Sequence, residues 1–229
     1  MVAIPYEIRR SDRARRVRIQ VSPDGVEVVV PRRMPLREVE PFVAEKRPWV
    51  KRTLRRLQEA QAQRTPTRLE DGGEVPFMER SLGLRVVVEP RRVRAHVAKR
   101  GDRLTVKVPD ASRETVRSAL EGWYRRRARE EVEPRLDAAT VRAGAPYAGL
   151  QIRGQRTRWA SCSSSGAMSF NWRLLLAPPE ILDYVVEHEV AHLSVHDHSN
   201  RFWSLLESRM PDYREHERWL KRHGPSLRL

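Results

Sequence analysis

The sequence predicts an α+β fold, with a strand-rich N-terminal part followed by a helical C-terminal core. Short segments in which apolar and polar residues alternate gather in the first half of the chain, as expected of half-buried strands. Apolar residues also recur at helical spacing over longer segments, most of them in the second half. With 229 residues, the chain is long enough for one large domain or two small ones.

A strand pair and one long helix are predicted in an N-terminal region that spans residues 1–73. Two segments with alternating apolar residues come first, Arg15–Val21 and Gly25–Pro31. An apolar stripe at helical spacing then runs to about Gln63. Pro48 lies inside this stripe and should kink or split the helix.

A second domain is predicted over residues 74–229. Its first strands share short apolar runs and are expected at Leu84–Val88, Val93–Val97 and Leu104–Val108. The helix after them should begin near Ser112, which is a suitable N-cap residue, and run to about Val141. Pro134 is expected to break this helix into two pieces.

Two more strands are expected on either side of a loop in the C-terminal half. The strands are predicted at Gln151–Arg156 and Ala167–Trp172, and the loop between them at Arg158–Ser163. Two helices, Asn200–Ser208 and Tyr213–His223, should close the chain.

The most informative motif is His188-Glu189-Val190-Ala191-His192, which has H-E-x-x-H spacing on a predicted helix that starts near Pro179. Histidines four residues apart share one helix face, so both imidazoles can bind one metal ion. Glu189 would lie beside that ion and accept a proton from metal-bound water. His198 supplies a third ligand and leaves one position open, as in catalytic zinc sites. The predicted metal is therefore Zn²⁺.

Other residues near the motif are alternatives for the third ligand or for support. His196 would share the face of His192 on a continued helix. We prefer His198, because it lies past the turn that must follow the helix. Glu207 on the next helix is a further alternative, as a carboxylate ligand. Asp197 could orient a ligand imidazole.

Charge and cysteine content bear on partners and location. The formal net charge is +15; residues 1–150 hold 34 basic and 21 acidic residues, against 11 and 9 in residues 151–229. Nucleic acid would suit the basic half, but the basic residues are spread out and few aromatics interleave, which favours a solvated arginine-rich surface. One cysteine, Cys162, excludes an internal disulfide and fits a cytoplasmic protein. No signal peptide or bilayer-spanning stretch is visible, so no membrane partner is expected; the sequence does not indicate an oligomeric state.

Several segments of the chain resemble the YgjP-like metallopeptidases, a family in the wider neighbourhood of the SprT-like and WLM proteases. The resemblance rests on segments spread along the C-terminal half: Arg158–Ser163, Phe170–Leu174, Tyr184–Leu193, His198-Ser199, Phe202-Trp203, Pro211–Tyr213 and Trp219–Lys221. It implies a zincin-like metallopeptidase core, zinc bound by His188, His192 and His198, and Glu189 as the base. Ala160 departs from the pattern, since the family usually has glycine there.

The leading interpretation is a cytoplasmic zinc-dependent peptidase that cleaves protein or peptide substrates by Glu-assisted attack of zinc-bound water. The strand at Ala167–Trp172 is expected to hold an extended substrate by edge pairing. One alternative is the same chemistry on a non-peptide, phosphate-containing substrate. Another is a nucleic-acid-binding protein or a protease recruited to DNA, for which binding should weaken steeply with added salt.

Overall fold

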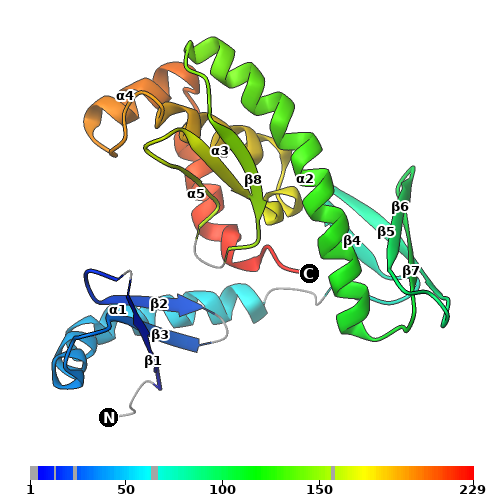
Figure 1. The fold of residues 1–229 in the computed structure, drawn as a ribbon, viewed down its shortest axis with the longest axis horizontal. Coiled ribbons are helices and arrows are strands. Elements are labelled where there is room, and N and C mark those ends of the chain that lie inside the picture. Colours follow the sequence, from blue (N-terminus) through cyan, green and yellow to red (C-terminus); the bar gives the residue numbers. More distant parts are fainter. Residues whose placement is uncertain (1–4, 13, 23–24, 63–66, 156–157) are drawn as a thin grey trace. The chain divides into compact units, whose positions relative to one another are not determined.

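The chain divides into two compact units, residues 1–65 and residues 66–229 (Figure 1). Strands at the N-terminal end and a helical C-terminal part confirm the predicted α+β class. Within the described residues, no helix is both long enough and apolar enough to cross a bilayer. This computed structural model describes residues 5–12, 14–22, 25–62, 67–155 and 158–229.

The first unit contains a three-stranded sheet and one long helix. The strand order is β1-β3-β2, with the central strand parallel to β1 and antiparallel to β2. The elements are β1 (Glu7–Ser11), β2 (Arg18–Ser22), β3 (Gly25–Pro31), a short 3-10 helix η1 (Leu36–Glu38) and α1 (Val39–Ala62). The core of the unit is made by valines of β3 and α1: Val28, Val30, Val39 and Val43.

Pro48 does not split α1, contrary to the prediction, because α1 is one helix of 24 residues. The proline is exposed, so water can bind the carbonyl that its missing N–H leaves free, while Val43 and Val50 are buried. The predicted strand pair is confirmed. Strand β1 was not predicted, since Glu7–Ser11 is almost wholly exposed and lacks an alternating apolar pattern.

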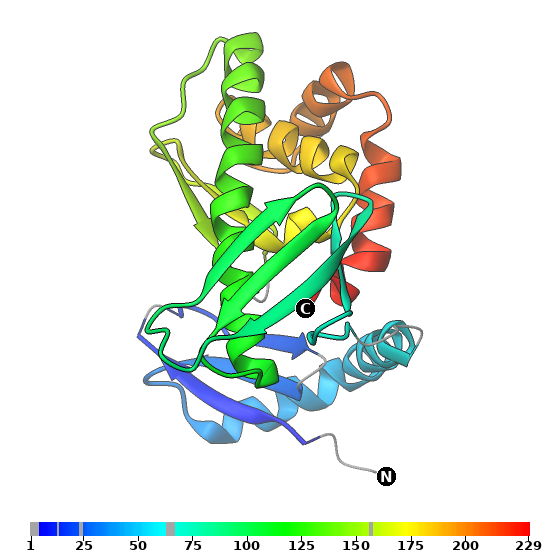
Figure 2. The same cartoon turned by 90° about the vertical axis from the view of Figure 1, so that its right-hand side faces the viewer.

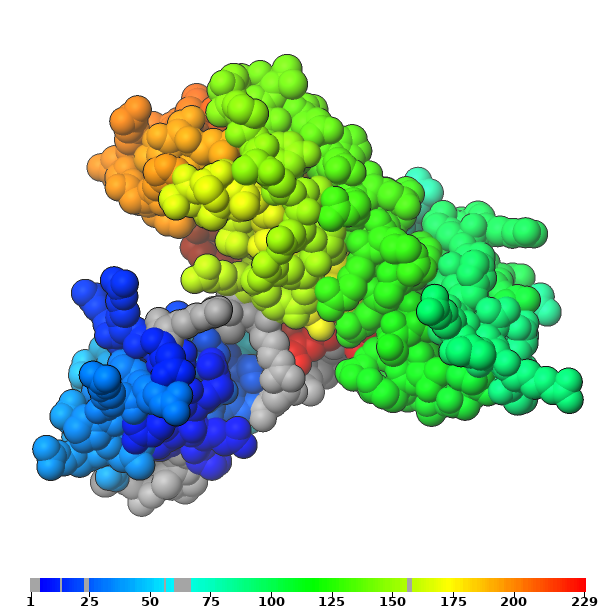
Figure 3. Space-filling view, viewed as in Figure 1, coloured from blue at the N-terminus to red at the C-terminus, as the bar shows by residue number. Residues whose placement is uncertain are grey.

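The second unit is organised around α2 (Arg113–Ala143), a helix of 31 residues. A four-stranded sheet of order β4-β5-β7-β6 lies in front of this helix in Figure 2, and its strands form the right-hand end of the unit in Figure 3. A three-stranded sheet has the order β8-β10-β9. The remaining elements, in chain order, are β4 (Glu74–Phe77), β5 (Arg80–Val88), β6 (His96–Arg100), β7 (Arg103–Val108), β8 (Gly149–Arg153), β9 (Ala160–Cys162), β10 (Ala167–Asn171), η2 (Trp172–Leu176), α3 (Pro179–Ala191), α4 (Asn200–Arg209), α5 (Tyr213–His223) and η3 (Gly224–Ser226).

The predicted break at Pro134 is wrong, because α2 runs through it without interruption. Pro134 is exposed, while Val132 and Leu136 on either side of it are buried in the core. The carbonyl of Glu131, in the turn that the proline disturbs, accepts a hydrogen bond from Arg135 Nη1 at 2.7 Å. Packing of the buried Val132 and Leu136 side chains outweighs the cost of the proline.

The first hairpin of the four-stranded sheet was not predicted in full. Met78 and Glu79 form its turn with φ angles of 47° and 71°, which a two-residue hairpin requires and which glycine or asparagine usually supplies. Without that sequence signal, β4 was missed and β5 was predicted too short. Strand β6 lies three residues later than predicted, because Val93 is 94% exposed in the turn before it.

In the three-stranded sheet, β10 is confirmed, but it is the central strand. The prediction that this strand pairs with a substrate at a sheet edge is therefore wrong. The edge is β9, which falls where the loop Arg158–Ser163 was expected. Strand β8 begins at Gly149, two residues before its prediction, and the predicted end at Arg156 lies outside the described residues.

Candidate metal centre

Helix α3 directs two histidines to one place. Its apolar face is buried in the core of the second unit through Ile181, Leu182, Val185, Val186 and Val190. Pro179 at its first position fits a helix start, as predicted. Since the buried face sets the rotation of the helix, the side chains of His188 and His192 emerge together, one turn apart.

Helix α3 ends just before His192, the second histidine of the motif. Ala191 is the last residue of α3 and His192 is its C-cap residue. A turn follows, and His198 lies in the segment that leads into α4. Ser199 occupies the N-cap position of α4, but its side chain makes no capping bond. Asp197 instead accepts a hydrogen bond from the Ser199 backbone N–H at 3.1 Å, so it supports this turn rather than an imidazole.

The three predicted ligands come together. Ligand atoms of His188, His192 and His198 all lie within 4.8 Å of one another. The Nε2 atoms of His188 and His198 are 3.1 Å apart. His196 is exposed and is not part of this group. Glu207 is not part of it either, and forms an ion pair with Arg214 at 3.5 Å.

Two of the three imidazoles, those of His188 and His192, have lowered pKa values. Burial, followed by the charges of His192 and His198, lowers the pKa of His188 to about 3. Burial also lowers the pKa of His192. Nδ1 of His192 lies 3.0 Å from the carbonyl oxygen of Val195, which can only accept, so this nitrogen carries the proton. Nε2 of His192 therefore keeps its lone pair for a metal.

Phe202 on α4 supports all three imidazoles. It is fully buried, and its ring centroid lies 4.9 Å, 4.5 Å and 4.8 Å from those of His188, His192 and His198. Sequence reasoning did not assign this role. The spacing of four residues from His198 to Phe202, across a helix start, is the signal from which it could have been inferred.

Glu189 directly follows His188 on α3 and is only 6% exposed. Burial raises the pKa of its carboxyl to about 7, although a hydrogen bond from the Cys162 backbone and the charge of Arg158 oppose this. A pKa near neutrality suits a group that accepts a proton and later releases it.

The hydrogen bond to Glu189 comes from the open edge of β9. The carbonyl oxygen of Trp159 and the N–H of Ser163 form hydrogen bonds with β10. Ser161, which lies between them, is paired with β10 in the antiparallel register. Because backbone groups alternate in direction along a strand, the N–H and C=O groups of Ala160 and Cys162 point away from β10. Cys162 N–H therefore donates to Glu189 from the edge of the sheet that no strand of the described residues occupies.

The donor set fits zinc. Three neutral imidazole nitrogens are typical zinc ligands, and two nitrogens on a tetrahedral zinc lie about 3.3 Å apart, close to the 3.1 Å between His188 and His198. Nδ1 of His188 is buried and has no hydrogen-bond partner among the described residues. Nε2 of His188 is the nitrogen that faces His198.

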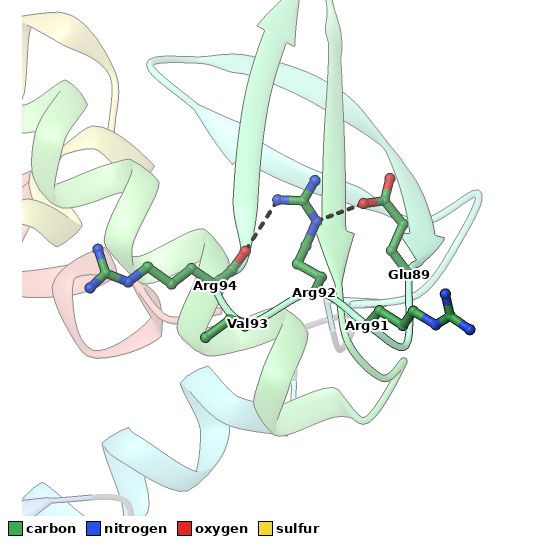
Figure 4. Close-up of a pocket in the computed structure, with 5 residues that line it drawn as sticks. All are labelled: Glu89, Arg91, Arg92, Val93 and Arg94. Atoms are coloured by element: carbon green, nitrogen blue, oxygen red, sulfur yellow. Dashed lines mark hydrogen bonds and ion pairs between the residues drawn. The ribbon is translucent and has the colours of Figure 1, made fainter.

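A cavity of about 500 Å³ elsewhere in the unit is not the candidate active site. It opens at the turn between β5 and β6 and is lined by Glu89, Arg91, Arg92, Val93 and Arg94 (Figure 4). Its one carboxylate, Glu89, is occupied by ion pairs with Arg92 and Lys107 at 2.7 Å and 2.9 Å. None of the five lining residues is a histidine or a cysteine.

The chain is similar to a known protein family and to a solved structure. A family model described as YgjP-like, metallopeptidase domain, matches residues 15–223. Among solved structures, the chain is similar to the crystal structure of the metallopeptidase zymogen of Pyrococcus abyssi abylysin. The identity is 27%, over 39% of this chain and 92% of that one, with a TM-score of 0.36. No curated protein matches the chain.

Proposed function

The chain belongs to the YgjP-like metallopeptidase family, and from this premise we propose that it is a zinc-dependent peptidase. In this proposal His188, His192 and His198 bind the metal, and Glu189 is the general base. One observation carries it: three imidazole nitrogens lie within 4.8 Å of one another, and the buried Glu189 directly follows the first of these histidines in the chain.

Zinc, when bound, supplies Lewis-acid chemistry that activates water and polarises the scissile carbonyl. The protein residues divide the remaining work. His188 and His192, whose pKa values are lowered, can hold the metal without having to lose a proton near neutral pH. Glu189 accepts a proton from the attacking water and passes it to the leaving amine nitrogen. Cys162 N–H keeps the Glu189 carboxylate in place, so the base is oriented before the substrate arrives.

The substrate that fits this arrangement is an extended peptide. The open edge of β9 offers the N–H and C=O groups of Ala160 and the C=O group of Cys162, which point away from the sheet, while the Cys162 N–H is bonded to Glu189. A peptide that adds a strand there would bind through its backbone, which gives weak dependence on its side chains. Glu189 is hydrogen-bonded to the same edge, so the scissile bond would lie next to the base.

The test compares two buried glutamates of α3 in the zinc-loaded full chain, with peptide substrates selected from a library. Glu189→Gln keeps the shape of the side chain but removes the base, so hydrolysis should fall by about a hundredfold or more. Glu187→Gln is the matched control, because Glu187 is 7% exposed and pairs with Arg142 rather than with the histidine group. Its hydrolysis should stay near the parent rate.

Zinc content is measured on the same samples. It should remain near one ion per chain in both variants, since neither changes a proposed ligand. Glu189→Gln protein that hydrolyses as fast as the parent would exclude Glu189 as the base. A parent protein that binds no zinc, or that cleaves no peptide when loaded, would contradict the proposed function itself.

A further inference from the structure

A cluster of arginines surrounds the start of η2, on elements that carry none of the three histidines. The guanidinium of Arg173 stacks on the ring of Trp172, with its central carbon 4.5 Å from the ring centroid. Arg125 reaches the same place from α2. Its Nη2 atom and Trp172 Nε1 lie 2.7 Å and 3.0 Å from the point where a Cβ on Gly154 would be. Two N–H donors therefore converge over a residue that has no side chain.

Two buried donors in this cluster lack hydrogen-bond partners. Trp172 is fully buried, and its Nε1 has no partner among the described residues. Nη1 of Arg173 is likewise buried and unpartnered among them. Buried donors in folded proteins are nearly always bonded, and exceptions usually mark the place of a water or an ion. Two such donors on neighbouring residues whose side chains stack indicate that something with acceptor oxygens belongs here.

Positive charge exceeds negative charge around these donors. Glu121 is the carboxylate that faces the cluster, and its oxygens lie 3.9 Å from Nη2 of Arg125 and 3.9 Å from Nη2 of Arg173. That separation is too long for hydrogen bonds, so Glu121 balances charge without satisfying the donors. Burial lowers the pKa of Arg173, and the nearby charges of Arg228, Arg125 and Arg117 lower it further, while Glu121 opposes them.

We propose that this cluster is a binding site for a phosphate-type oxyanion, held by Trp172 Nε1–H and by the guanidinium groups of Arg173 and Arg125. A tetrahedral oxyanion accepts hydrogen bonds on several sides at once, and arginine forks match its oxygens. Glu121 balances one of the two guanidinium groups, so one positive charge remains for the bound oxyanion. Neither the zinc ligands nor the base of the proposed peptidase takes part in this site.

Binding of inorganic phosphate to the full chain, measured by calorimetry at constant ionic strength, tests the site. Arg125→Gln removes a donor from a half-exposed side chain and should weaken binding about tenfold or more. Glu121→Gln removes the competing carboxylate and should tighten binding. Arg126→Gln is the matched control, because Arg126 is the next residue of α2 and is exposed. It changes the net charge equally and should leave binding unchanged.

Gly154→Ala separates a built site from general attraction by positive charge. It keeps every charge but places a Cβ 2.7 Å and 3.0 Å from the two converging donors, so binding should weaken while circular dichroism shows an unchanged fold. A parallel titration with phenyl phosphate distinguishes the source of the oxyanion. Tighter binding of phenyl phosphate would identify a phosphomonoester as the ligand class, and tighter binding of inorganic phosphate would identify the free ion.

Two outcomes would overturn the proposal. If phosphate binds the parent, Arg125→Gln, Glu121→Gln and Gly154→Ala with equal affinity, it is an adventitious ion only. If no binding is detected at millimolar phosphate and low salt, water satisfies the two buried donors and the cluster is not an anion site.

Discussion

Replacing Phe202 should weaken metal binding as well as the fold, and the two losses can be separated. Phe202 is fully buried, and its ring contacts all three imidazoles at centroid distances of 4.5 to 4.9 Å. Phe202→Ala removes that shared surface, which should lower the free energy of unfolding of metal-free protein by about 3–5 kcal/mol. Residues that orient metal ligands typically contribute about 10- to 100-fold to metal affinity, so we expect a loss in that range.

Leu206→Ala is the matched control, because Leu206 lies one turn further along α4 and is also fully buried, but carries no ring to stack on the histidines. It should cost about 2–5 kcal/mol in the metal-free protein and leave zinc affinity unchanged. The assay is urea unfolding with chelator and with buffered free zinc. At free zinc about 1,000 times the Kd of the parent, zinc should add about 4.1 kcal/mol of stability to the parent and to Leu206→Ala.

For Phe202→Ala at the same free zinc, a tenfold loss of affinity leaves an increment of about 2.7 kcal/mol, and a hundredfold loss leaves about 1.4 kcal/mol. The difference from the control is therefore large enough to measure. An increment in Phe202→Ala equal to that of Leu206→Ala would refute the idea that the Phe202 ring positions the ligands. If zinc affinity falls by the same factor in Phe202→Ala and in Leu206→Ala, then any weakening of α4 disturbs the site.

Three more outcomes are expected. His198→Ala should weaken zinc binding far more than His196→Ala in a competition titration with a chelator, because only His198 lies in the group of three histidines; equal losses would place the third ligand wrongly. In metal-free protein, the free energy of unfolding should fall as the pH decreases from about 6.5 toward 3, since unfolded His188 takes up a proton that the folded residue, with its pKa near 3, does not. His188→Gln should flatten this part of the pH profile, and an unchanged slope would count against the burial argument. Cys162→Pro should remove the N–H that orients Glu189 and slow hydrolysis about tenfold. The fold should survive, because a proline is tolerated where an edge-strand N–H points away from the sheet. Cys162→Ala keeps the N–H and should hydrolyse at the parent rate.

The parts of the site that sequence could predict are those set by local periodicity. The apolar stripe of α3 determines which face is buried, and so it places His188 and His192 side by side whatever the rest of the chain does. The same local reasoning failed at Pro48 and Pro134. Each proline lies on the exposed side of a helix whose other side is buried, and packing of that buried side outweighs the local preference to break.

What local patterns could not predict depends on pairing between distant segments. Strand β9 has only three residues, and its place at the sheet edge follows from the parallel pairing of β8 with β10. That pairing turned the strand expected at the edge into the central one. The role of Cys162 was hidden for the same reason, because its contribution to Glu189 is a backbone N–H, which carries no side-chain signature.

The residues that build the metal centre come from separate segments of the chain. His188, His192 and Glu189 come from one helix and are positioned as soon as α3 packs against the core. The third histidine and the ring beneath all three come from the segment that begins α4, and the bond that orients the base comes from β9. Disturbing α4 should therefore act on metal affinity, and disturbing β9 should act on hydrolysis with the metal still bound. Measuring zinc affinity and turnover together in Phe202→Ala and Cys162→Pro would show whether the two supports are separate.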